Sequence, residues 1–358
     1  MQRPWTRGLA AVLAVIGLAA CGSSPAGPSG SGNSLSTPSN FRIVLQRVFF
    51  TSNEVQVAWT GNGNSYRLQA GTAPGLSDLL NTELTGTSYT WAAPRDAGTY
   101  YIHVTALRGS ETSNTSVALP VYTIDLRHVI DALFFRSGPM ADSPANALTN
   151  PYAAVWPDGT AIRIRVSEES GQTARANAEI FGNDFAALFG GAVTTTTELT
   201  PEDFHATSLS QVPPFTVAMR VLFGFCTTGA IACAYYGPSP VGPDRSIITM
   251  NTNGGSDAIA HEVGHAYGFG HVRVSAAVRQ ELNFLMNPQL VSTQMTEPEK
   301  NAIAAARAGG IAPGWRRSDA LAAGLVLPFS PSAAANAGPL DASRALDRCT
   351  IVEREPGR

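Results

Sequence analysis

Apolar and polar residues alternate with a period of two in the first third of the chain. Val55, Val57 and Trp59 share one face of a strand, and the same alternation recurs twice further along. Clusters of glycine, asparagine and proline separate these segments, as turns separate short strands. The pattern predicts about five to seven antiparallel strands over residues 41–122, folded as an all-β sandwich.

The periodicities become mixed in the next part of the chain. Residues 161–166 alternate apolar residues with arginines, which predicts a strand with one solvated face. Residues 170–190 carry apolar side chains at spacings of three and four, which predicts an amphipathic helix. Strict alternation predicts further strands at 215–223 and 246–251. We therefore expect an α+β domain over residues 123–317.

A last helix is predicted near the end of this domain. Thr296 is a suitable N-cap and Pro298 suits a first turn, with an alanine-rich run following to residue 308. The chain then becomes rich in Ala, Pro and Ser without a sustained period. We expect residues 318–358 to form a loosely ordered tail, although residues 321–329 could pack back on the domain.

The N-terminus has the pattern of an export signal. Arg3 and Arg7 precede an apolar run that is too short to cross a bilayer comfortably. The run ends in Leu-Ala-Ala-Cys at Cys21, which resembles the lipobox of bacterial lipoproteins. This resemblance implies that residues 1–20 are a lipoprotein signal peptide and that Cys21 is lipidated. An ordinary signal peptide that happens to precede a cysteine is the alternative.

Gly, Ser and Pro dominate residues 21–40, which predicts a flexible tether. The lipobox resemblance implies a protein anchored in a bacterial cell envelope outside the cytoplasm, and Gly22 favours the outer membrane. The net charge of −3 and the pI near 6.1 give no reason to expect a nucleic-acid partner. We expect a monomer whose contact with the membrane is the N-terminal lipid.

One short stretch carries the chemistry. His261 and His265 are four residues apart, so that on a helix they project from one face and can reach a single Zn²⁺. Glu262 stands beside them as a candidate general base. Gly268 can take the left-handed conformation that ends a helix, and His271 can then return as a third ligand. A fourth coordination position left open for water is typical of a catalytic zinc site.

Residues 261–271 fill every fixed position of His-Glu-x-x-His-x-x-Gly-x-x-His, the signature of the metzincin zinc metallopeptidases, which this chain resembles. Met286 follows His271 by 15 positions in Leu-Met-Asn-Pro, which is similar to the family's methionine turn. The length of this connection is similar to that in the matrixin branch. The residue after the third histidine usually distinguishes the branches of the family, and Val272 is not typical of any named branch. Pro288 stands where some metzincins have an extra tyrosine ligand, so that role is not carried over.

The resemblance implies a metzincin-type zinc endopeptidase with one catalytic ion and a protein or peptide substrate. Three neutral imidazoles leave Zn²⁺ its full double charge, so that the pKa of a bound water falls to about 7. Glu262 would take that water's proton during attack on the peptide carbonyl and pass it to the leaving amine. Met286 would form a soft apolar floor under the histidines. In the family, substrates lie antiparallel along an exposed edge strand, expected here between residues 215 and 236.

Two other functions remain open at this stage. The chain could be a lipid-anchored surface adhesion or binding protein with a catalytically idle zinc fold. It could also be a narrow processing enzyme that cleaves one partner protein. The intact Glu262 argues against the idle site, because a site that only binds has no physical need for a base beside the metal.

The predicted sandwich resembles a fibronectin type III module. The resemblance rests on Trp59, the strand at 66–68, Pro74-Gly75 and the late strand at 100–104. It implies a spacer that positions the enzyme, or an accessory that binds a glycan or a protein.

The remaining cysteines and histidines are less specific. In an oxidising compartment, Cys226 and Cys233 could close a local disulfide, and Cys349 has no evident partner. His128 and His205 are isolated, and a packed or surface imidazole is the default for each.

Two further expectations concern surface residues. His103 should point outward from its strand. Acidic residues in loops (Asp142, Asp158 and Asp244) have the chemistry to bind calcium, but solvated loop acids are commoner, and nothing in the sequence specifically indicates calcium.

Overall fold

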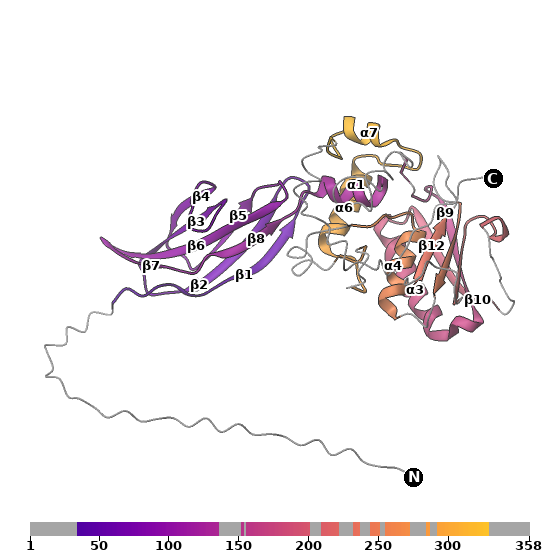
Figure 1. Cartoon of the computed structure of the whole chain (residues 1–358), viewed down its shortest axis with the longest axis horizontal. Helices are drawn as coiled ribbons and strands as arrows, with labels where there is room; N and C mark the ends of the chain where they lie inside the picture. Colours follow the sequence, from indigo (N-terminus) through magenta and orange to yellow (C-terminus); the bar gives the residue numbers. More distant parts are fainter. Residues whose placement is uncertain are drawn as a thin grey trace, which may run out of the picture. The chain divides into compact units, whose positions relative to one another are not determined.

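A computed structural model describes the residues drawn in colour in Figure 1. The described residues are 34–135, 152–153, 155–200, 209–221, 232–236, 244–250, 255–272, 284–286 and 292–328. The expected signal peptide, the lipidation site Cys21 and most of the expected tether lie outside them. Within these ranges no helix is long and apolar enough to cross a bilayer.

The N-terminal part is a sandwich of two antiparallel sheets. One sheet has the order β1-β2-β5, and the other has the order β4-β3-β6-β7 with β8 also paired to β6. The strands are β1 (Ser39–Val48), β2 (Asn53–Thr60), β3 (Ser65–Gly71), β4 (Leu80–Leu84), β5 (Ser88–Ala93), β6 (Gly98–Arg108), β7 (Glu111–Thr115) and β8 (Leu119–Thr123). The sandwich predicted from the alternation is confirmed.

The core of the sandwich is made by the alternating positions. Val55, Val57 and Trp59 on β2 are buried, and so are Leu68 on β3 and Val104 on β6. Because successive side chains of a strand point to opposite faces, one strand supplies every second residue to this core.

His103 is where the expectation for the sandwich was wrong. Its side chain is 4 % exposed rather than solvated. β6 is an inner strand, paired with β3 along one edge and with β7 and β8 along the other, so that side chains of neighbouring strands surround those of β6. Burial lowers the pKa of His103 below its ordinary value.

The C-terminal part contains a mixed sheet of order β10-β9-β11-β13-β12, in which β12 alone runs antiparallel. Its strands are β9 (Thr160–Ser167), β10 (Val193–Thr200), β11 (Thr216–Val221), β12 (Ala232–Tyr236) and β13 (Arg245–Met250). Helix α3 (Gly171–Leu188) contacts β9 and β10, and α4 (Ser256–Ala266) contacts β12, β13 and α3. The two helices therefore cover one face of the sheet (Figure 1).

The predicted helix at 170–190 is confirmed as α3, which buries Ala174, Ala178, Phe181 and Phe185 as the spacing required. Strand β9 likewise matches the alternation at 161–166. Its apolar residues are buried under α3, which crosses over to the parallel strand β10.

Further helices complete this part of the chain. They are α1 (Leu126–Phe135), α6 (Glu297–Ala308) and α7 (Arg317–Ala322), with short 3₁₀ turns at Glu168–Ser170 and Leu209–Gln211. The sequence predicted α6 with its Thr296 cap, which is confirmed, but it predicted neither α1 nor β10.

The expectation of a loose tail from residue 318 is wrong for its first part. Ala320 on α7 is fully buried, and Leu325 and Val326 belong to the same core as the sheet. Arg317 donates two hydrogen bonds to Asp131 on α1, and both side chains are buried, so that this segment is fastened to α1. Residues 329–358 lie outside the described ranges.

Candidate metal centre

Helix α4 carries the first two candidate ligands. His261 and His265 are both fully buried and lie one turn apart on the same face of the helix. By residue type, Ser256 or Asp257 would be the expected N-cap, but the helix begins at Ser256 and its N-cap is Gly255. Asp257 instead lies in the first turn, where a carboxylate favours the positive end of the helix dipole.

The end of α4 redirects the chain towards the metal site. Gly268 has φ 98°, and its N–H donates to the carbonyl of His265 at 2.8 Å, while the N–H of Phe269 donates to that of Gly264 at 3.2 Å. This pair of bonds is the Schellman arrangement that ends a helix at a left-handed residue. The turn predicted for Gly268 is confirmed, and His271 follows it on the returning chain.

The three imidazoles converge on one point. Nε2 of His271 lies 3.1 Å from Nε2 of His261 and 2.9 Å from Nε2 of His265. Around a tetrahedral Zn²⁺ with Zn–N bonds of about 2.0–2.1 Å, ligand nitrogens are about 3.3–3.4 Å apart. The described residues contain no other cluster of three metal-ligating side chains.

The hydrogen bonds of the His261 and His265 rings determine which nitrogen of each ring carries the proton and which can bind a metal. Nδ1 of His261 lies 2.7 Å from the carbonyl of Leu285, and Nδ1 of His265 lies 2.7 Å from the carbonyl of Phe269. A carbonyl only accepts, so each Nδ1 carries the proton and each Nε2 presents a lone pair. If Nε2 of His271 carried a proton, its single N–H could donate to only one of these two lone pairs. A bound cation satisfies all three nitrogens, so the residues fit Zn²⁺.

Glu262 follows His261 directly on α4 and is fully buried. A buried carboxyl group on the residue next to a candidate metal ligand has the chemistry of a proton carrier.

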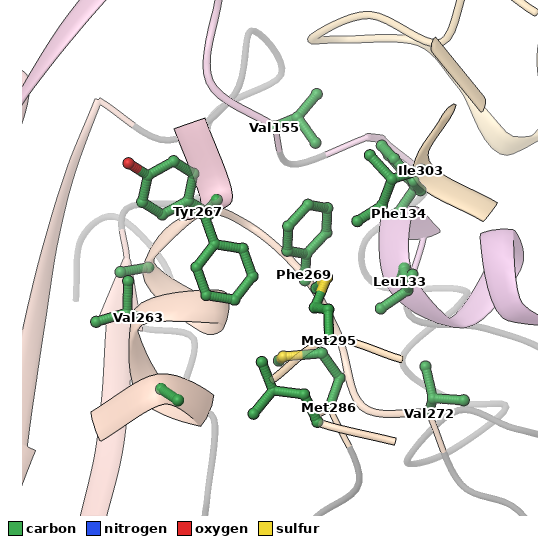
Figure 2. Close-up of a cluster of buried hydrophobic side chains, with 14 of the residues drawn as sticks. Leu133, Phe134, Val155, Val263, Tyr267, Phe269, Val272, Met286, Met295 and Ile303 are labelled. Atoms are coloured by element: carbon green, nitrogen blue, oxygen red, sulfur yellow. The ribbon is translucent and has the colours of Figure 1, made fainter. Parts of the chain in front are cut away.

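Met286 packs against Gly264 on α4, which lies between the two helix ligands in the sequence. A Cβ built on Gly264 would come within 2.4 Å of the Met286 sulfur, so the helix glycine leaves the space that the thioether fills. The carbonyl of Met286 also accepts from the N–H of Val272, next to His271. Figure 2 shows the surrounding apolar cluster, to which Val263 on α4 and Phe269 in the returning chain contribute.

Three supports of the site were not predicted. The carbonyl of Leu133 on α1 accepts from the N–H of Gly270, one residue before His271. Nε1 of Trp156 donates to the carbonyl of Ala266 at the end of α4. Main-chain acceptors have no signature in a sequence, so no pattern could have revealed these contacts.

The third support is Glu299 on α6, which is fully buried. Burial raises the pKa of its carboxyl above the ordinary value, although N–H donors from Met286, Thr296 and Leu285 act in the opposite direction. The sequence Thr296-x-x-Glu299 has the pattern of a capping box, but that pattern predicts only where α6 begins and not the contacts of Glu299 with Leu285 and Met286.

The other candidate residues do not join this site. Cys233 is disulfide-bonded, but Cys226 and Cys349 lie outside the described residues, so the pairing stays a prediction. Asp158 pairs with Arg307 at 2.7 Å, and Asp244 pairs with Arg245 at 2.6 Å, as solvated loop acids do.

The remaining predicted positions fall partly outside the structure. Burial lowers the pKa of His128, which is half-buried on α1. His205, Asp142 and Pro288 lie outside the described ranges.

Comparisons with known proteins bear on the sandwich and not on the metal centre. No protein-family model matches the chain, and no curated protein does. Similar solved structures include the fibronectin type III domain of the human collagen alpha-1(XX) chain, with 20 % identity over 27 % of this chain and 93 % of that one, at a TM-score of 0.22. Another is that of human fibronectin type III domain containing protein 3, with 19 % identity over 28 % and 91 %, at a TM-score of 0.20.

Proposed function

We propose that this chain is a zinc-dependent endopeptidase of the metzincin type. The observation that carries the proposal is the convergence of three imidazole Nε2 atoms, two with protonation fixed by main-chain carbonyls. The buried Glu262 follows the first of these histidines on α4. A structural zinc site would hold four protein ligands. Three histidines with an adjacent carboxyl group are instead the composition of a hydrolytic site.

The chain's own residues supply binding and proton transfer. His261, His265 and His271 would hold Zn²⁺, which would supply the Lewis acidity that polarises a peptide carbonyl and makes water a nucleophile near neutral pH. Glu262 accepts the proton of the attacking water and then donates it to the departing amine. The buried position of Glu262 excludes bulk water that would compete for this proton.

An extended substrate has a strand to pair with. β12 lies at the edge of the sheet, and among the described strands it pairs only with β13. It also contacts α4, so that a peptide added to this edge would run close to the metal centre. Main-chain pairing gives affinity with little side-chain selectivity, which suits an endopeptidase acting on exposed protein segments.

The rest of the chain sets where the enzyme acts. The lipobox-like Cys21 and the Gly/Ser/Pro tether would attach it to an envelope membrane outside the cytoplasm. The sandwich would be a fibronectin type III-like module that serves as a spacer or as an accessory that binds a glycan or a protein.

The test compares residues 22–358 with the Glu262→Gln variant on a mixed unfolded-protein substrate. We expect cleavage by the parent, abolished by a zinc chelator, and a rate about 10²–10⁴-fold lower for Glu262→Gln with zinc retained. If both proteins hold one zinc ion and neither cuts any protein in a broad panel, general proteolysis is wrong. A narrow processing enzyme or a binding protein with an idle site would then remain.

A further inference from the structure

The Glu299 carboxylate accepts more hydrogen bonds than the N-terminus of a helix requires. In the capping box of α6, its Oε2 accepts from the N–H of Thr296 at 2.8 Å. The same carboxylate also accepts from the N–H of Leu285 at 3.0 Å and from the N–H of Met286 at 2.8 Å. A capping box is a surface arrangement that needs only the first of these bonds, whereas Glu299 is fully buried.

The two extra bonds fix the main chain at Leu285 and Met286. That main chain supports the metal centre in two places: the carbonyl of Leu285 accepts from Nδ1 of His261 at 2.7 Å, and the carbonyl of Met286 accepts from the N–H of Val272 at 2.8 Å. The side chain of Met286 gives a third support, because it fills the space left by Gly264 between the two histidines of α4.

We propose that Glu299 is a positioning residue of the metal centre, which acts through residues 285–286 on the orientation of His261 and on the place of His271. This inference rests on the proposed function only in assuming that the three histidines bind zinc. The outer partner of a metal-ligating histidine fixes the tautomer and the orientation of its ring, and loss of such a partner typically weakens metal binding about 10–100-fold. Here the outer partner of His261 is a carbonyl, whose own position depends on the Glu299 carboxylate.

The alternative is that Glu299 serves only the stability of α6. Both roles predict a lower melting temperature for a Glu299 variant, so stability cannot separate them. Zinc affinity can, because a helix cap has no direct effect on the direction of a ring nitrogen on α4.

The test uses Glu299→Gln with two matched controls. The glutamine has a single acceptor oxygen and turns an NH₂ group towards one of the main-chain N–H donors, so that residues 285–286 must shift while most of the volume is retained. Glu297→Gln removes the same charge from the first turn of α6, where the side chain is exposed and does not contact residues 285–286 in any described hydrogen bond. Thr296→Ala removes the capping hydroxyl, which also donates to Oε2 of Glu299 at 2.8 Å, but keeps the carboxylate and its two main-chain donors, the N–H groups of Leu285 and Met286.

Zinc dissociation constants are measured by competition with a chromogenic chelator, and the visible absorption of the Co²⁺-substituted proteins reports the ligand geometry. We expect zinc binding about 10–100-fold weaker and a changed Co²⁺ spectrum for Glu299→Gln. Both controls should stay within about twofold of the parent in affinity and keep its spectrum, even if Thr296→Ala melts at a lower temperature.

A Glu299→Gln protein with the zinc affinity and the Co²⁺ spectrum of the parent would overturn the proposal, as would an equal loss of affinity in Thr296→Ala. If Glu299→Gln folds only when zinc is present, the Co²⁺ spectrum of the folded protein decides, because stabilisation by bound metal is expected under both roles and a changed ligand geometry under the proposal alone. If the parent binds zinc but cleaves nothing, the proposed function fails, while the affinity comparison still decides the role of Glu299.

Discussion

The sandwich and the metal centre are held by different kinds of contact. In the sandwich, Leu68 on β3 lies opposite Val104 on β6, and both side chains are fully buried between the sheets. In the metal centre, Nδ1 of His261 donates to the carbonyl of Leu285, 24 positions away, and the N–H of Leu285 donates to Glu299, a further 14 positions along. Apolar packing has no preferred direction, whereas each of these hydrogen bonds requires a donor and an acceptor at a set angle.

This difference has a consequence for how each part fails. Loss of one apolar side chain from the sandwich should cost stability in proportion to the cavity it leaves and should not alter chemistry elsewhere. Loss of one support from the metal centre should change the orientation of a ligand before it unfolds the chain. The predictions below test this separation, beginning with the largest expected effect.

Removal of the metal should affect the part of the chain around the metal centre and leave the sandwich unchanged. His265→Ala, or a chelator added to the parent, should abolish proteolysis and any stabilisation by zinc, which is about 4 kcal/mol when free zinc is 1,000 times its dissociation constant. Hydrogen exchange followed by mass spectrometry should then show faster exchange in peptides from residues 255–272 and unchanged exchange in peptides from residues 53–60. Equal acceleration in both would show that the two parts unfold together.

Truncation of a side chain in the sandwich core should lower stability and leave zinc affinity and the cleavage rate nearly unchanged. Leu68 is fully buried, so Leu68→Ala should destabilise the sandwich by about 2–5 kcal/mol in urea denaturation. Zinc affinity and the cleavage rate should stay within about twofold of the parent under conditions where the protein is folded. A tenfold loss of zinc affinity would refute the separation.

Gly264→Ala should lower both the stability of the protein and its affinity for zinc. The added Cβ would lie 2.4 Å from the Met286 sulfur, and overpacking of this kind costs about 1–3 kcal/mol. Because Met286 belongs to the segment that supports His261, zinc affinity should fall as well. Gly86→Ala is the matched control, since its nearest contact is 3.9 Å, and it should leave both zinc affinity and the melting temperature unchanged.

The smallest effect concerns pH and His103. Burial lowers the pKa of this histidine in the folded protein, so the folded state binds fewer protons than the unfolded state at pH values below the ordinary pKa of about 6.5. The free energy of unfolding should therefore rise with pH up to that value and be constant above it. His103→Gln should lower the slope of stability against pH below about 6.5. An unchanged slope would mean that His103 does not titrate differently in the two states.

The sequence predicted well those features that depend on neighbours along the chain. The period of two in Val55, Val57 and Trp59 predicted β2, and the spacing of Phe181 and Phe185 predicted the buried face of α3. Gly268 predicted the helix end because a left-handed turn at that point has few alternatives. The spacing of the three histidines likewise brought them to one point, as the Nε2 distances show.

Features that depend on distant segments were missed for a physical reason. Helix α1 is an exception, because its apolar residues Leu126, Val129, Ile130 and Leu133 recur at helical spacing and the signal for it was therefore present in the sequence. His103 was expected to be solvated because alternation along one strand does not reveal which strands flank it. The roles of Leu133 and Trp156 arise from main-chain carbonyls, which every residue has, so that only the fold determines which of them are used.

X-ray absorption at the zinc edge of the purified protein tests the central claim most directly, since it reports the atoms bound to the ion independently of any substrate. We expect one zinc ion per chain with a first shell of nitrogen and oxygen at about 2.0–2.1 Å and outer-shell scattering from three imidazoles, all lost in His265→Ala. Sulfur ligands at about 2.3 Å, or a zinc content that does not change in His265→Ala, would contradict the assignment of His261, His265 and His271 as the metal centre.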